Sequence, residues 1–196
     1  MGVRLRKAAM CLLVGGIFVT ACAPSDSGEG EIIEDTTAVD AAVPAGPTDA
    51  EIAHIVVTAN TIDIDAGRLA KEKGSSEEVI AFGDRMITDH TAVNEQASAL
   101  AGRLNLTPAD NATSQSLKAS ADQAMSDLHA ASGADFDRAY LEREVAFHQQ
   151  VLDAIDNTLL PNAQNADLRA LLEQTRPAIA SHLEMAKQLQ SGLPAE

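Results

Sequence analysis

Hydrophobic residues recur every three or four positions over most of the chain beyond residue 48, which is the period of an amphipathic α-helix. Runs of β-branched residues are few, and neither Asn-Gly nor Asp-Gly marks a hairpin. The pattern therefore predicts an all-α protein, with helices over residues 50–73, 76–104, 113–131, 135–159 and 166–190.

The expected ends of these helices carry recognisable signals. Thr48-Asp49-Ala50-Glu51 and Ser75-Ser76-Glu77-Glu78 both have the form of a capping box, in which two side chains satisfy free backbone N–H groups. Asp135 is expected to cap the fourth helix and Pro161 to end it. Pro177 lies inside the fifth helix and predicts a kink there.

Residues 48–196 have the length of one domain. Four long helices and one short helix with brief connections predict an antiparallel four-helix bundle with one extra short helix. The chain has 3% aromatic residues and no Trp, so Leu, Ile, Val, Met and Ala must form a narrow core.

The N-terminus has the layout of a secretory signal. Arg4, Arg6 and Lys7 precede a short apolar run that ends in Val19-Thr20-Ala21-Cys22. That ending resembles a bacterial lipobox, so residues 1–21 are expected to be a lipoprotein signal peptide. The alternative, a transmembrane anchor, would need roughly 20 apolar residues, more than this run supplies.

Cleavage before Cys22 would place lipid on its sulfur and on the new amino group. Residues 22–47 are rich in small, acidic and Pro residues without a hydrophobic period, which predicts a disordered acidic tether. Ala23 and Pro24 follow the cysteine, as in lipoproteins sorted to the outer membrane of Gram-negative bacteria. We expect an exported protein, lipid-anchored in the cell envelope at the periplasmic face of the outer membrane.

Charge and cysteine content narrow the classes of partner. The full chain has a net charge of −15, and loss of the three basic signal residues leaves 11 basic and 29 acidic residues, a net charge of −18. Such a field argues against nucleic acid. It suits either solubility or the capture of cations. Cys11 and Cys22 are the two cysteines, so the mature domain would have no free thiol and no disulfide.

Polar residues interrupt the apolar faces of the predicted helices at a few positions. Three of the five histidines do so, and three carboxylates lie on or beside the same faces; a carboxylate there is costly unless paired. His54 and His129 instead fall on polar or terminal positions. The candidate metal ligands are therefore His90, His148, His182, Glu144, Asp63 and Asp89.

The heights of these residues along their helices also agree. Asp63, His90 and His148 lie within one residue of the middles of their helices, and His182 lies four residues away, roughly 6 Å along the axis. The middles of antiparallel helices come to one level, so the sequence predicts one central layer. Imidazole and carboxylate ligands suit Fe, Mn, Zn or Cu. The alternative is a structural layer that sets helix register, with a Glu144–His148 hydrogen bond and no metal.

Four strings at these positions carry a resemblance to a known family. They are residues 63–70, residues 82–90 with Met-x-x-Asp-His, residues 136–148 with Phe-Asp-x-x-Tyr, and residues 176–183. Over about residues 50–190 the chain resembles the domain of unknown function 4142 family. The resemblance implies an exported, ferritin-like four-helix bundle of bacteria, with family histidines at His90, His148 and His182 and acids at Asp63 and Asp65.

The chain departs from the expected patterns at two places. The family often has Asp where this chain has Phe147. The di-iron site of ferritins needs paired Glu-x-x-His motifs, whereas this chain has one, Glu51-Ile52-Ala53-His54, on a polar face. A ferritin-like fold therefore does not imply ferroxidase activity.

Two functions follow as hypotheses. The first is an envelope-anchored bundle that binds a transition metal through the central layer. The alternative is a non-enzymatic envelope lipoprotein with structural histidines, which binds another protein or supports stress tolerance. A hydrolase is disfavoured because the chain has neither Gly-x-Ser-x-Gly nor a phosphate-binding loop.

Overall fold

The computed structural model describes residues 46–194, and these residues are helical without any strand. The elements are α1 (Asp49–Lys73), α2 (Glu77–Arg103), α3 (Ala112–Ala130), α4 (Gly133–Ala154), the π-helical turn η1 (Ile155–Leu159), α5 (Leu160–Asn162) and α6 (Ala166–Gly192). The prediction of an all-α protein is confirmed. The predicted signal peptide, Cys22 and the tether up to residue 45 lie outside the described residues.

Within residues 46–194, every helix is too short or too polar to span a membrane. These residues fall within a compact unit, 42–196. Two clusters of buried apolar side chains lie within it, so the unit has a core of its own and meets the usual criterion for a part that folds alone.

The capping of the first two helices confirms one prediction and corrects another. Thr48 and Glu51 form the predicted capping box at α1. At α2 the cap is Ser76, which accepts a hydrogen bond from the backbone N–H of Val79. The predicted box from Ser75 is wrong, because the backbone N–H and hydroxyl of Ser75 donate to the carboxylate of Asp137 in α4.

Both predicted ends of the fourth helix are also wrong. The helix begins at Gly133, with Ser132 at the cap position, and Asp135 lies in the first turn. The chain stays helical beyond Pro161, to Asn162. The reason is η1: one extra residue widens the turn, and α5 restarts with Pro161 in its first turn, where a missing N–H costs nothing.

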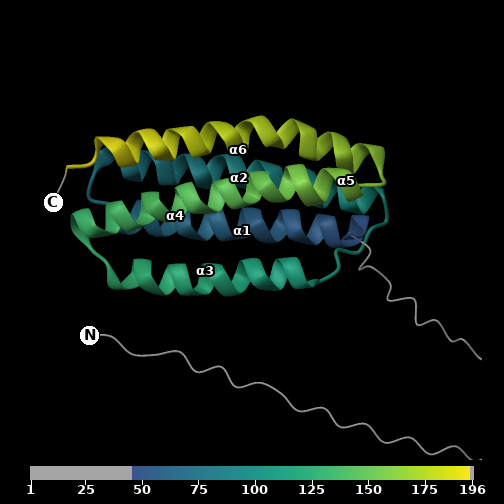
Figure 1. Ribbon diagram of the computed structural model, residues 1–196, viewed down its shortest axis with the longest axis horizontal. Coiled ribbons are helices and arrows are strands. Elements are labelled where there is room, and N and C mark those ends of the chain that lie inside the picture. The colour runs from purple at the N-terminus through teal and green to yellow at the C-terminus, as the bar shows by residue number, and fades with distance from the viewer. Residues whose placement is uncertain (1–45, 195–196) are drawn as a thin grey trace, which may run out of the picture. The chain divides into compact units, whose positions relative to one another are not determined.

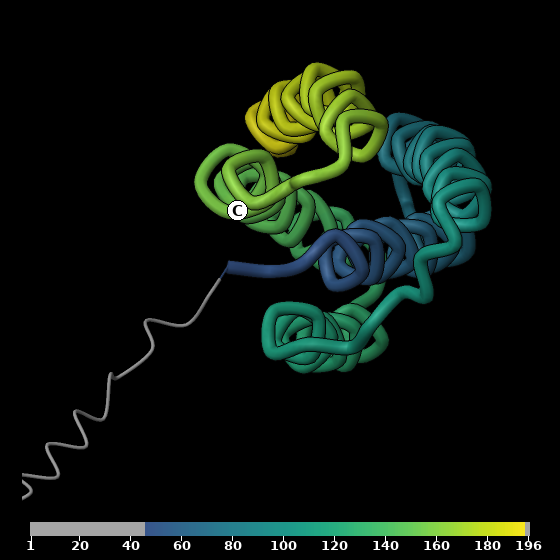
Figure 2. Tube along the Cα trace, turned by 90° about the vertical axis from the view of Figure 1, so that its right-hand side faces the viewer, coloured from purple at the N-terminus to yellow at the C-terminus, as the bar shows by residue number. Residues whose placement is uncertain are grey.

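The long helices lie alongside one another as a helical bundle (Figure 1). Viewed along the bundle, α1, α2, α6 and α4 surround a common interior, and α3 lies on the outside against α1 and α4 (Figure 2). Each of the contacting pairs α1–α2, α2–α6, α6–α4 and α4–α1 runs in opposite directions.

The buried apolar residues form two clusters, one toward each end of the bundle. The aromatic cluster contains Ala66, Leu69, Ala70, Val79, Phe82, Met86, Leu128, Phe136, Tyr140, Leu141 and Ala186. The aliphatic cluster is mostly Ile, Leu and Val and includes Ile52, Ile55, Leu100, Leu117, Ile155, Leu159, Leu168, Leu171, Leu172 and Ile179. Each of the four surrounding helices contributes to both, so each must cross the level between them.

Helices α1 and α2 approach each other closely beside the aromatic cluster. A Cβ on Gly67 would lie 2.7 Å from the carbonyl oxygen of Gly83. A Cβ on Gly83 would lie 2.8 Å from the Cβ of Ala70. Glycine at both positions lets the two backbones touch, which fixes the height of α2 against α1.

Candidate metal centre

A polar layer separates the two apolar clusters. It is formed by Asp63 of α1, His90 of α2, Glu144 and His148 of α4, and His182 of α6, all at most 2% exposed. On α1 and α2 these residues lie between the segments that enter the two clusters, and on α4 and α6 they lie beside Phe147 and Leu183, the members of the aliphatic cluster nearest to the aromatic one. The structure thus brings together five of the six residues that the sequence singled out.

The sixth residue, Asp89, has a different position. Its side chain is 39% exposed and lies at the rim of the layer. Its Oδ2 accepts hydrogen bonds from Nε2 of His182 at 2.9 Å and from Nε of Arg85 at 3.2 Å. Asp89 therefore orients a histidine rather than facing the interior itself.

The other two histidines of the layer are held in the same way. Nδ1 of His90 lies 2.7 Å from Oδ1 of Asn60, and the amide group of Asn60 donates to the carbonyl of Val56. Oδ1 is therefore the acceptor, and Nδ1 of His90 carries the proton. Nδ1 of His148 likewise donates to the carbonyl oxygen of Glu144 at 2.9 Å.

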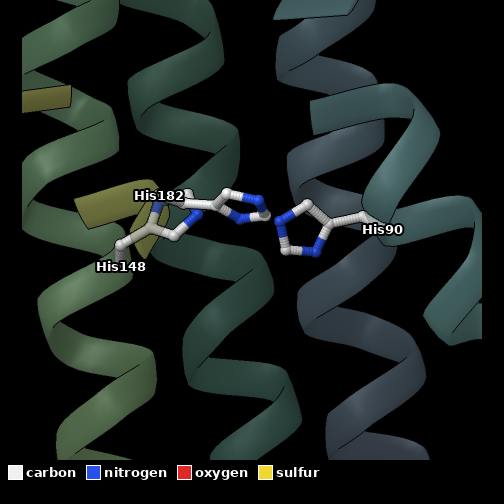
Figure 3. A group of neighbouring side chains, drawn as sticks. All are labelled: His90, His148 and His182. Carbon is white, nitrogen blue, oxygen red and sulfur yellow. The ribbon is translucent and has the colours of Figure 1, made fainter. Parts of the chain in front are cut away.

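The remaining ring nitrogen of each histidine is free of hydrogen bonds to the described residues. These atoms are Nε2 of His90, Nε2 of His148 and Nδ1 of His182, and all are buried. One ring nitrogen from each of the three lies within 4.8 Å of the other two, and Figure 3 shows the three rings meeting between the helices. Buried unpartnered acceptors are costly, so their convergence requires an explanation.

Two buried carboxylates complete the layer. Nη1 of Arg143 donates to Oδ1 of Asp63 at 2.6 Å and to Oε1 of Glu144 at 2.5 Å. The second oxygen of Asp63 lies 3.4 Å from Nε2 of His90 and 3.8 Å from Nε2 of His148. Asp63, Glu144 and His148 form a second group whose potential ligand atoms lie within 4.8 Å of one another.

Sequence reasoning missed Arg143, as it missed Asn60. The side chain of Arg143 is 7% exposed, and its guanidinium lies 4.5 Å from the centre of the Phe147 ring. A signal was present: position 143 follows Tyr140 by three, so it borders the buried face of its helix. Phe147 thus supports the arginine that pairs with both carboxylates.

The pKa shifts of His90, His182 and Asp63 suit metal ligands, whereas that of His148 has the opposite direction. Burial lowers the pKa of His90 and of His182 below the ordinary 6.5, which keeps both rings neutral. At His148 burial acts in the same direction, but Asp63 and Glu144 outweigh it and raise the pKa. Burial alone would raise the pKa of Asp63, yet Arg143 and the two nearby histidines lower it, so the carboxyl group is ionised.

These residues fit a transition-metal ion by their chemistry. Metal-bound histidines almost always donate their second N–H to a carboxylate, a carbonyl or another oxygen, which fixes the ring. His90, His148 and His182 each do this, through Asn60, the carbonyl of Glu144 and Asp89. Three imidazoles and one carboxylate form a donor set that Zn, Fe, Mn and Cu accept.

Other candidates lie away from the layer. Asp65, an acid position implied by the resemblance, is exposed and pairs with Arg68. Glu51 serves the cap of α1. His54 is half-buried, with Nδ1 3.8 Å from Asp110, and His129 is exposed. The single Glu-x-x-His string therefore contributes nothing to the centre.

Comparison with known proteins gives one result of substance. Residues 34–189 match the family model described as domain of unknown function (DUF4142). Searches of curated proteins and of solved structures return no significant match. The match spans most of the chain and includes every residue of the polar layer, and the chain belongs to the DUF4142 family.

Proposed function

We propose that the protein is an envelope-anchored helical bundle that binds a transition-metal ion at the polar layer. The ligands are His90, His148, His182 and Asp63, with Glu144 beside them. The observation that carries the proposal is the pairing pattern of the three histidines: one nitrogen of each ring is held by an oxygen, and the other is buried without a partner. A metal ion satisfies all three free nitrogens at once.

We further propose that the bundle has the ferritin-like arrangement. Support comes from the path of the chain between α2 and α4. α3 returns along the whole bundle, so that α2 and α4 run in the same direction (Figure 1). Ferritin-like folds have one such long crossover. In those proteins, too, side chains of facing helices build the metal site in the bundle core.

Metal uptake by residues 42–196 tests the proposal. The metal-free unit is titrated with Fe²⁺, Mn²⁺, Zn²⁺ and Cu²⁺, and bound metal is counted by mass spectrometry and calorimetry. We expect one ion per chain. His148→Ala removes a ligand and abolishes stoichiometric binding, whereas His129→Ala, at an exposed position, leaves it unchanged. Asp89→Ala removes the acceptor that holds His182 and weakens binding about 10–100-fold.

Two results would contradict a metal site. One is a unit that stays metal-free at modest excess of all four metals. Another is uptake that survives His148→Ala, since the bound ion would then lie elsewhere on an acidic surface. Circular dichroism of each variant distinguishes loss of the metal site from loss of the fold.

A structural layer is the second candidate, and one observation favours it. Arg143 already pairs with both Asp63 and Glu144, so each buried carboxylate has a cationic partner without a metal. On this reading the protein is a non-enzymatic lipoprotein that acts through a protein partner or in stress tolerance. Replacing His148 would then lower the stability of the metal-free unit, and added metal would not change the stability of the native unit.

We propose that Cys22 is lipidated and holds the protein at the periplasmic face of the outer membrane. Val19-Thr20-Ala21-Cys22 and the following Ala23 support this. Cells that express the full chain are fed labelled palmitate. Label should enter the protein and fractionate with the outer membrane, and Cys22→Ser should abolish both results. Label that persists in the Cys22→Ser chain, or a native chain without label, would refute the anchor.

A further inference from the structure

A cavity of about 350 Å³ extends from the polar layer into the aliphatic cluster. Its walls are mainly Ile, Leu, Val and Ala side chains of α1, α3, α4, η1 and α6, among them Ile55, Leu117, Leu171 and Ile179. This volume lies in the range of small-molecule sites, which are mostly apolar with a few convergent polar groups. Well-packed cores do not leave space of this size.

The cavity has two different polar ends. At the outer end, the lining residues Thr113, Ser116 and Gln150 of α3 and α4 are exposed, so this end opens to solvent. At the inner end, Asn60, Asp63 and His90 line it, and all three are buried. A molecule that enters from outside therefore passes along apolar walls and ends at the layer.

The π-helical turn η1 is a second, independent observation at the same place. Ile155 and Leu159, the first and last residues of η1, both line the cavity. Such turns are rare and appear frequently at functional sites. Here the extra residue displaces the wall of the cavity from the position that a regular α-helix would give it.

The inner end presents hydrogen-bond acceptors. Nδ1 of His90 donates to Asn60, so its Nε2 has only a lone pair to offer, and that atom has no partner. Asp63 accepts from Arg143 through Oδ1 and presents Oδ2 3.4 Å from Nε2 of His90, while both polar atoms of the Asn60 side chain are engaged within the protein. A ligand must therefore bring a donor to this end.

The local charge determines which donor fits. Arg143 donates to both Asp63 and Glu144, so each buried carboxylate already has a cationic partner. A charged ammonium or carboxylate group would lose its hydration in a cavity with mostly apolar walls, which is costly. A neutral hydroxyl group donates one hydrogen bond and adds no charge.

We infer that the cavity between α1, α3, α4, η1 and α6 binds a neutral apolar molecule with one terminal hydroxyl group, an alcohol or phenol that donates to His90 and Asp63. The aliphatic walls hold its body, and the exposed end between α3 and α4 is its entrance. The inference concerns the layer without an ion, because a bound metal would occupy the same atoms of His90 and Asp63.

Three matched probes test the inference on metal-free residues 42–196 by calorimetry: 4-pentylphenol, 4-pentylanisole and 4-pentylbenzoate. They share one apolar body and differ in the polar group. We expect the phenol to bind about tenfold or more tighter than the anisole, because the anisole has no donor and leaves buried acceptors unpaired. The benzoate should bind weakest of the three.

A variant in which a side chain fills the cavity provides the second test of the inference. Ala154 of α4 lines the cavity and is half-buried, so Ala154→Phe places a ring in the space. Ala134→Phe, at an exposed position on the same helix, is the control. We expect phenol binding to be lost in the first variant and kept in the second, with both variants folded by circular dichroism.

Equal affinity for phenol and anisole would overturn the inference, because the acceptors would then play no part. Failure of the folded native unit to bind the phenol at millimolar concentration would do the same, as would binding that survives Ala154→Phe or a preference for the benzoate. These readouts are taken without metal, so failure of metal uptake leaves them unchanged and the two proposals fail separately.

Discussion

The two ends of the bundle use the same helices but pack differently. In the aromatic cluster, Phe136 and Tyr140 stack with ring centres 6.1 Å apart, and the contact of Gly67 with Gly83 brings α1 and α2 together. The aliphatic cluster contains a cavity and, at η1, a departure from regular helix. The polar layer lies between a tightly packed end and an end with space.

This difference separates two tasks. A histidine site needs its helices held to a fraction of an ångström, and the aromatic end supplies that constraint on one side of the layer. A ligand needs free volume, and the aliphatic end supplies it on the other side. One long helix bundle can thus position side chains rigidly and leave room beside them without a separate domain.

The largest expected effect comes from removing the charge that balances the layer. Arg143→Met leaves Asp63 and Glu144 buried without their shared cation. Breaking a buried ion pair from one side costs about 3–5 kcal/mol. Urea unfolding of the metal-free unit should show this loss of stability.

A surface ion pair is the control for that substitution. Arg68 pairs with Asp65 at 2.9 Å, and both side chains are more than half exposed. Arg68→Met should change the free energy of unfolding by about 0.5 kcal/mol or less. Equal effects at Arg143 and Arg68 would mean that the layer is open to water.

A substitution at the tight end tests the helix contact next. Gly83→Ala places a methyl group 2.8 Å from the Cβ of Ala70 and 2.8 Å from the carbonyl oxygen of Gly67, and overpacking of this kind costs about 1–3 kcal/mol. Gly102 of the same helix has no atom within 4 Å of such a Cβ, so Gly102→Ala should stabilise by about 0.5–1 kcal/mol. Opposite signs in thermal unfolding are the expected result.

Adding volume at each end compares the two ends directly. Ala186 is fully buried in the aromatic cluster, so Ala186→Leu should cost about 1–3 kcal/mol. Ala154 faces the cavity, where a larger side chain has space, so Ala154→Leu should change stability by less than about 1 kcal/mol. If the two substitutions cost the same, the aliphatic end has no usable space.

The regular part of the fold could be predicted from the sequence. The three- and four-residue period gave each long helix to within a few residues, since apolar faces reflect burial directly. The capping box at Ser75 was wrong because of a contact between distant segments, and the end of the fourth helix was wrong because of an irregular turn. Asp137 occupies Ser75 across the bundle, and η1 carries the helix past Pro161. Neither has a local sequence signal.

The residues of the candidate site were predictable for a related reason. A histidine or carboxylate on an apolar face must be buried, and helix length then sets its height, which placed His90, His148 and Asp63 at one level. Asp89 was expected among the interior ligands, but its side chain lies at the rim of the layer. Arg143 was missed because a long side chain reaches the interior from the edge of the face.

The smallest expected effect comes from removing an ion pair beside η1. Nε and Nη2 of Arg176 donate to the two oxygens of Asp156, at 2.6 and 2.7 Å, and these hydrogen bonds lower the pKa of Asp156 below its ordinary 3.8. A carboxyl group with a lowered pKa stabilises the folded state above its unfolded pKa, and the contribution disappears as the pH falls through the folded pKa. Asp156→Asn should therefore lower the melting temperature at pH 7 by less than any substitution of a buried residue above. Its difference from the native unit should shrink below pH 4 and also in high salt, because the pair is exposed. A difference that stays constant from pH 7 to pH 3 would mean that Asp156 acts through the helix backbone at η1 rather than through its charge.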